Sequence, residues 1–179
     1  MFKFALILCG FICVAQDQPV ISWNESYELS WADFKDNPDS KDRAIAITAS
    51  GITFGFSIKQ TDTQVVSFTT DVLAHFYPEQ SWYKAVEADT HVLGHEQLHF
   101  DITELFARKF RQRISQLKVS NTISSQLKKL HNTINKELTS MQNVYDADTD
   151  NSRNAEQQAI WKAQIATELT ILSRYKLVD

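Results

Sequence analysis

The spacing of apolar residues changes near residue 80, and this change limits the folds available to the chain. Before it, the segments RAIAITAS, GITFGFSIKQ and TQVVSFTTDV alternate apolar residues with small or polar ones, as strands with one buried face do. After YPEQS, apolar residues recur every three or four positions, as in amphipathic helices. The sequence therefore predicts an α+β fold, with N-terminal antiparallel strands packed against C-terminal helices.

Three helices are expected in the second half. Pro78 and Ser81 are start signals for a helix over residues 81–117, which can kink at Gly94. A second helix is predicted over residues 121–142. The polar segment DADTDNSRN is typical of a loop and leads into the last helix.

Composition narrows the functional class. The chain has 179 residues, of which 43% are hydrophobic and 22% charged, which suits one domain with a substantial core. Its net charge of -4 is spread along the chain, without the basic footprint that neutralises phosphates. Nucleic acid is therefore not an expected partner, and the protein is expected to be a monomer.

The first 16 residues, MFKFALILCGFICVAQ, resemble a secretory signal peptide. Lys3 precedes an apolar run from Phe4 to Ala15, which is too short to span a bilayer. The expected division is a signal peptide at residues 1–16 and a single domain at residues 17–179. Because only one positive charge precedes the run, a buried N-terminal helix or strand is the alternative. No later stretch approaches 18 apolar residues, so the mature chain is expected to be secreted or periplasmic and to lack a transmembrane segment.

Both cysteines, Cys9 and Cys13, lie within the expected signal peptide. Its cleavage would leave no thiol and would exclude disulfides and cysteine metal sites. A lipoprotein anchor is the weaker alternative, because bulky Leu8 and Ile12 precede the cysteines where such processing favours a small residue.

The segment HVLGHEQLHF contains the pattern H-E-x-x-H at His95, Glu96 and His99. Histidines one helical turn apart can direct their ring nitrogens at one zinc ion, with Zn–N bonds of about 2.0–2.1 Å. Glu96, a step of about 100° around the helix, can then reach a metal-bound water and act as a general base. The alternative is a solvated polar stripe on an ordinary helix.

The other polar residues of this helix are not expected to bind the metal. His91 lies about 12 Å from His99 along the helix axis, so one ion cannot take all three histidines, and His91 is a surface or rim residue. Asp101 and Glu104 project from roughly the opposite side, and Glu104 is expected to pair with Arg108.

The third ligand must come from elsewhere, because Leu105 stands where a longer zinc motif would have histidine. The acidic segment YDADTD supplies oxygen donors, and Asp148 is the candidate ligand. Asp150 and Ser152 are expected to cap the last helix. Tyr145 could donate a hydrogen bond to a developing oxyanion, or could be a packed tyrosine.

Several blocks resemble a bacterial family called domain of unknown function 922, described as secreted zinc-dependent proteases. The resemblance covers nearly all of the mature sequence, through LSWADFKDNPD (29–39), SWYK (81–84), HEQLHFDITELFARK (95–109) and YDADTDNSRNAEQQAIW (145–161). It implies a zincin-like metallopeptidase, with His95 and His99 as zinc ligands and Glu96 as general base. It implies no established substrate.

One position departs from the family's pattern. The setting Y-D-x-E-T-x-H-[GS] has histidine where this chain has Asn151. If that histidine is the third ligand, either Asp148 or Asp150 replaces it or the site binds metal weakly. If the acidic position of Asp148 is the ligand, the departure affects only the surroundings of the site.

The leading hypothesis is thus a secreted or periplasmic zinc peptidase that acts on a peptide or protein, with the strand TQVVSFTT pairing with extended substrate. A zinc-dependent amidase acting on cell-wall peptides differs only in substrate. The alternative is a non-catalytic envelope binding protein on a zincin-like scaffold. The remaining residues shared with the family are expected to pack: Trp23, Trp31, Phe34, Phe100, Gln158 and Trp161.

Overall fold

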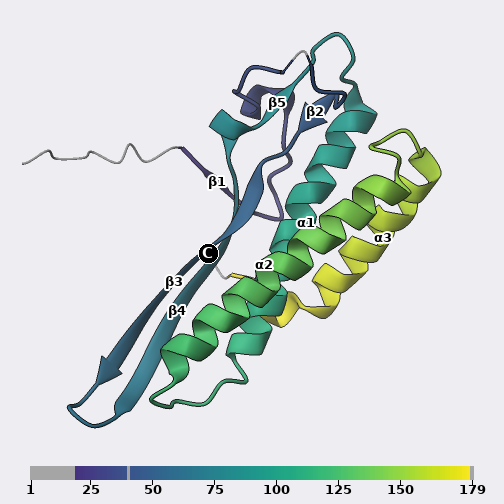
Figure 1. Cartoon of the computed structure of the whole chain (residues 1–179). Coiled ribbons are helices and arrows are strands. Elements are labelled where there is room, and N and C mark those ends of the chain that lie inside the picture. The colour runs from purple at the N-terminus through teal and green to yellow at the C-terminus, as the bar shows by residue number, and fades with distance from the viewer. Residues whose placement is uncertain (1–18, 40, 178–179) are drawn as a thin grey trace, which may run out of the picture.

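A computed structural model describes residues 19–39 and 41–177. The expected signal peptide at residues 1–16, with Cys9 and Cys13, lies outside this part. Strands come first and three helices follow, so the α+β prediction is confirmed (Figure 1). No helix within the described ranges is long and apolar enough to cross a membrane.

The main sheet is antiparallel and has the strand order β1-β4-β3. The strands are β1 (Ile21–Ser22), β3 (Ser50–Gln60) and β4 (Val65–Phe76), of which β3 and β4 form a long hairpin. Gly51 lies within β3 and pairs with His75 of β4. A second, two-stranded sheet pairs β2 (Ala46–Ile47) with β5 (Trp82–Tyr83).

The three helices are α1 (Thr90–Ile114), α2 (Ile123–Asp148) and α3 (Ala155–Ile171). Short 3-10 turns lie at η1 (Trp31–Asp33), η2 (Pro78–Gln80) and η3 (Ser173–Tyr175). The helix count agrees with the sequence prediction.

The predicted start of the first helix, at residue 81, is wrong. Pro78 opens the turn η2, and the Ser81 hydroxyl donates to the Tyr77 carbonyl at 2.9 Å instead of capping a helix. The helix begins at Thr90, where the Asp89 carboxylate accepts a hydrogen bond from the Val92 amide at 2.8 Å. Pro78 and Ser81 therefore lie in the connection that leads into β5. This connection does not become helical, because β5 pairs with the distant strand β2.

The predicted end of α2 is also too early. The helix continues to Asp148, so the first part of the expected polar loop is helical. Asn154, rather than Asp150 or Ser152, caps α3 by accepting a hydrogen bond from the Gln157 amide at 3.2 Å.

Helix α1 lies between the sheet and the other two helices (Figure 1). Its fully buried apolar residues form the centre of the core, together with residues of β4, α2 and α3: Ile102, Leu105, Phe110, Phe76, Ile134 and Ile165. Burying one such side chain stabilises the fold by roughly 1.5–3 kcal/mol. Because α1 is enclosed on both sides, the polar residues His95 and Glu96 in its N-terminal half are also buried.

The expected packing residues follow this plan. Phe34 and Phe100 are buried, and Trp31 stacks on Tyr83 with ring centroids 4.5 Å apart. Trp23 donates its indole hydrogen to Asp101 at 2.8 Å.

The expected ion pair on α1 is present, since Arg108 Nε donates to Glu104 Oε1 at 2.9 Å. Arg111 shares the same carboxylate at 3.1 Å.

Candidate metal centre

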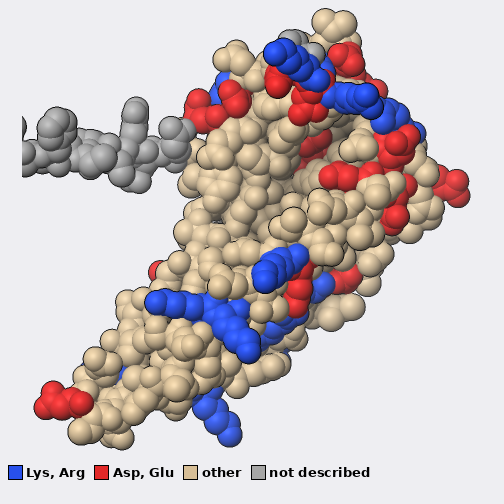
Figure 2. Space-filling model, viewed as in Figure 1, with Lys and Arg blue, Asp and Glu red and all other residues tan. Residues whose placement is uncertain are grey.

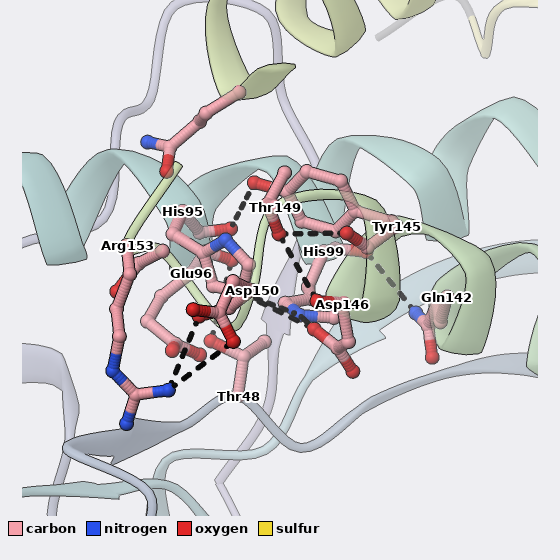
Figure 3. A network of polar contacts seen from close by, with 12 residues as sticks. Thr48, His95, Glu96, His99, Gln142, Tyr145, Asp146, Thr149, Asp150 and Arg153 are labelled. Carbon is pink, nitrogen blue, oxygen red and sulfur yellow. Dashed lines mark hydrogen bonds and ion pairs between the residues drawn. The ribbon is translucent and has the colours of Figure 1, made fainter. Parts of the chain in front are cut away.

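His95 and His99 lie on one face of α1, with their Nε2 atoms 3.3 Å apart. Both nitrogens approach Oδ1 of Asp146 on α2, at 3.2 Å from His95 and 2.8 Å from His99 (Figure 3). In the part of the chain that the structure describes, these three residues form the group that could hold a metal ion. The donors are two imidazole nitrogens and one carboxylate oxygen, a set that suits a divalent transition metal.

The structure brings Asp146, and not the predicted Asp148, to the histidines. Since α2 extends through both positions, a step of two residues turns the side chain by about 200° around the helix axis. Asp148 therefore faces α3, where its Oδ2 accepts a hydrogen bond from the Trp161 indole at 3.1 Å. The carboxylate that the structure places beside the two histidines is therefore Asp146 and not the predicted Asp148.

Tyr145 lies behind the histidines and does not line the cavity beside them. Its ring is fully buried and stacks on the His95 imidazole, with centroids 4.5 Å apart and an interplanar angle of 20°. Its hydroxyl donates to the His95 carbonyl at 3.4 Å. Burial, followed by the negative charges of Glu96 and Asp146, raises the pKa of Tyr145. The packed-tyrosine alternative thus describes its position, and Tyr145 does not line the cavity in which an oxyanion would form.

The stacking on Tyr145 matters for His95 because no hydrogen bond among the described residues fixes Nδ1, the ring nitrogen that faces away from Asp146. Nδ1 of His95 is buried and has no hydrogen-bond partner among the described residues. Metal-binding histidines usually donate this N–H to a carboxylate or carbonyl, which fixes the ring. In this protein the stacked Tyr145 ring restricts the orientation of the His95 imidazole.

The three donors are electrostatically coupled. Burial alone would lower the pKa of His99, but the hydrogen bond to Asp146 and the charges of Glu96 and Asp146 raise it. Burial would likewise raise the pKa of Asp146, yet the hydrogen bonds from His95 and His99 and their charges hold it well below its usual range. The protonated His99 imidazole and the ionised Asp146 carboxylate thus stabilise each other's charged forms.

Glu96 and the three donors line one cavity of about 290 Å³. The cavity is lined on one side by residues 44–48, which include β2, and on the other by α1 and the end of α2. Glu96 is only 4% exposed. Figure 2 shows a hollow in the upper part of the molecule, with acidic side chains in and beside it.

The segment TQVVSFTT, which was expected to pair with substrate, does not line this cavity. Its residues belong to the hairpin of β3 and β4. The extended segment beside the candidate metal site is instead residues 44–48. The alternation of apolar and polar residues is similar in all the predicted strands, so it could not show which of them lies beside the site.

Asn151 and Ser152 line the cavity but do not belong to the group of three residues that could hold a metal ion. The departure from the family's pattern at Asn151 thus leaves the three candidate ligands intact. His91 is not a ligand either, as expected: its Nε2 atom lies 2.7 Å from the Ser152 carbonyl oxygen. Gln158 holds α3 to α1 through a 3.0 Å hydrogen bond to the His91 carbonyl.

Sequence reasoning missed Asp146 because the predicted second helix ends at residue 142. The apolar spacing along this helix contained the necessary signal. The residues Ile134, Leu138, Met141 and Tyr145 follow one another at steps of three or four positions. Extending the helix by this spacing would have put Asp146 and Asp148 on different faces.

A family model described as "Bacterial protein of unknown function (DUF922)" matches residues 25–154. The matched region contains the hairpin, α1, α2 and every residue of the candidate metal centre. No curated protein matches the chain, and no solved structure does. Since the match covers well over half of the chain, the protein belongs to this family.

Proposed function

We propose that this member of the DUF922 family is a zinc-dependent peptidase of the secreted or periplasmic space. The observation that carries the proposal is the meeting of His95, His99 and Asp146 within 2.8–3.3 Å of one another, beside the buried Glu96. The compartment is inferred from the signal-peptide pattern at residues 1–16.

The separations of the donor atoms suit zinc. Bonds of about 2.0–2.1 Å in a tetrahedron place neighbouring ligand atoms roughly 3.3 Å apart. Three protein ligands leave the fourth position for water or substrate, as in catalytic zinc sites. Two histidines and one carboxylate also hold iron(II) in some oxygenases. The additional carboxylate of Glu96, next to His95 in the pattern H-E-x-x-H, favours zinc hydrolysis over iron chemistry.

A bound zinc ion would supply Lewis acidity and bring the pKa of water close to about 7. The role of Glu96 is that of a general base, which takes the proton from the attacking water and delivers it to the leaving amine. His99 would lose its proton on binding the metal, because only a neutral imidazole nitrogen can serve as a ligand. Tyr145 keeps the His95 ring in place by stacking.

The edge of β2 provides a place for an extended peptide. Ile45 of this segment points its carbonyl toward β5, since that carbonyl accepts a hydrogen bond from the Lys84 amide. In an antiparallel pair with this register, every second residue points its N–H and C=O groups toward the partner strand. By the same alternation, the N–H and C=O groups of Ala46 point away from β5. Because residues 44–48 line the cavity, a substrate strand could add to this edge and cross the candidate metal site.

A non-catalytic envelope binding protein is the second candidate. It is favoured by Asn151, since the resembled pattern has a histidine at this place in the cavity wall. Such a protein would use the same cavity and β2 edge to bind a peptide without cleaving it.

Zinc content and peptide hydrolysis separate the two candidates. The native protein is expected to hold one zinc per chain and to cleave unfolded protein substrates, whereas Glu96→Gln should keep its zinc and lose at least about 100-fold in kcat. Glu87→Gln, which changes an acid just before α1, serves as the matched control and should behave as the native protein does. Native protein that holds zinc and binds peptides without hydrolysis would support the binding candidate, and native protein that takes up iron instead would exclude the zinc peptidase.

A further inference from the structure

Three successive residues after α2 have left-handed backbone conformations. The φ angles are 47° at Asp150, 50° at Asn151 and 72° at Ser152, and none of these residues is glycine. Residues with side chains adopt this region singly and at an energetic cost. A run of three persists only where surrounding contacts hold it, and such runs often lie at functional sites.

The side chain of His91 holds this turn from α1. Its Nε2 atom lies 2.7 Å from the Ser152 carbonyl oxygen, and since a carbonyl only accepts, the ring donates. Ser152 is 6% exposed, so solvent does not readily replace this donor. The His91 carbonyl is itself fixed by Gln158 of α3 at 3.0 Å.

The held turn is tied to the metal cluster at its other end. The Asn151 amide donates to the Asp146 carbonyl at 2.9 Å, and the Thr149 hydroxyl donates to the Tyr145 carbonyl at 2.6 Å. Asn151 and Ser152 also form part of the cavity wall beside Asp146. The turn therefore fixes both the last turn of α2 and the shape of the cavity.

We infer that His91 is a positioning residue for Asp146. One turn before His95 on the same helix, it clamps residues 150–152, and the clamped turn sets the distance between the Asp146 carboxylate and the two histidines. The three histidines of HVLGHEQLH then have one joint function, in which two bind the metal and the first positions the carboxylate. The part of this inference that concerns zinc rests on the proposed function.

The test compares His91→Ala with His91→Gln, whose side-chain amide can restore the donor. His91→Ala is expected to weaken zinc binding about tenfold, measured by competition with a chelator, because one hydrogen bond to a buried carbonyl is lost. The visible absorption bands of the cobalt-substituted protein should shift, since the ligand arrangement changes. His91→Gln should recover most of both properties. Glu156→Gln, an exposed change in the first turn of α3 and outside residues 150–152, should change neither.

A second measurement tests, without any metal, whether His91 holds the turn at residues 150–152. Arg153 is exposed and directly follows the turn, so trypsin cleavage after it reports how often the turn opens. His91→Ala should speed this cleavage in chelator about tenfold, while His91→Gln should not. Native protein without zinc affinity would contradict the proposed function but leave this readout intact. Unchanged cleavage in His91→Ala would overturn the clamp. Unchanged zinc affinity and an unchanged cobalt spectrum in that variant would overturn its link to Asp146.

Discussion

Nε2 of His99 lies 2.8 Å from Oδ1 of Asp146, although 47 positions separate the two residues in the sequence. The contact joins α1 to the last turn of α2, so the candidate metal centre is a link between two helices. Its geometry depends on the packing of those helices, on Tyr145 behind the histidines and on the turn that follows Asp148.

Asp146 and Asp148 are expected to respond differently to the same change. Asp146→Asn should weaken zinc binding by at least about 100-fold, because it removes a charged ligand, and losses in the surroundings of a metal site alone already cost about 10–100-fold. Asp148→Asn keeps an oxygen for the Trp161 indole and should retain native affinity. Chelator competition measures both variants. Equal losses in the two would show that the ligand has been assigned to the wrong carboxylate.

Tyr145 should act through its ring and not through its hydroxyl. Tyr145→Phe keeps the ring that stacks on His95 and is expected to change zinc affinity and kcat less than about threefold, since its hydroxyl makes only a long contact of 3.4 Å. Tyr145→Leu removes the stacked ring, creates a cavity and should destabilise the protein by about 2–5 kcal/mol. Thermal unfolding and kcat are measured together. A large loss of kcat in Tyr145→Phe with unchanged stability would restore the oxyanion role.

The metal-free protein should lose stability as pH rises above about 6.5. The folded-state pKa of His99 is raised above its usual 6.5, so its contribution is complete below that pH and disappears as pH rises through the raised value. Asp146, whose pKa is lowered from its usual 3.8, contributes above that pH and stays ionised throughout this window. Zinc affinity should increase over the same window, because His99 must lose its proton to bind metal.

Melting temperatures in chelator between about pH 6 and pH 9 check this prediction. His99→Asn removes the titrating group and should flatten the part of the profile that His99 causes. A native profile with the same slope as this variant would contradict the coupling of His99 to Asp146.

The β2 edge should affect substrate binding and not the chemical step. Ala46→Pro removes the N–H that points away from β5, and is expected to raise KM about tenfold with little change in kcat, as the loss of one hydrogen bond implies. Ala46→Ser keeps this donor and provides the control. A KM that is the same in both variants would place the peptide elsewhere in the cavity.

The periodicity of apolar residues was sufficient to predict the strand-rich first half and the three helices, because one buried face repeats every two or every three to four residues. His95, Glu96 and His99 were predicted because their spacing lies within about one helical turn. The ends of the helices were harder to predict from the sequence. Ser81 carries a helix start signal, yet the pairing of β5 with β2 places it in a connection between strands.

Asp146 and the role of His91 could not be predicted for a related reason. Both depend on contacts between distant segments, Asp146 with His99 at a separation of 47 positions and His91 with Ser152 at 61. Local spacing reports which residues share a face of one helix. It does not report which residue of another helix lies opposite that face.

The most direct test of the account is the position of zinc in crystals of the native protein grown with one equivalent of the metal, located by anomalous diffraction at the zinc edge. One ion is expected, bound by His95 Nε2, His99 Nε2 and Asp146 Oδ1 at distances of roughly 2.0–2.2 Å. Histidines that stay paired with Asp146 while no ion lies between them, or an ion bound through Asp148, would contradict it.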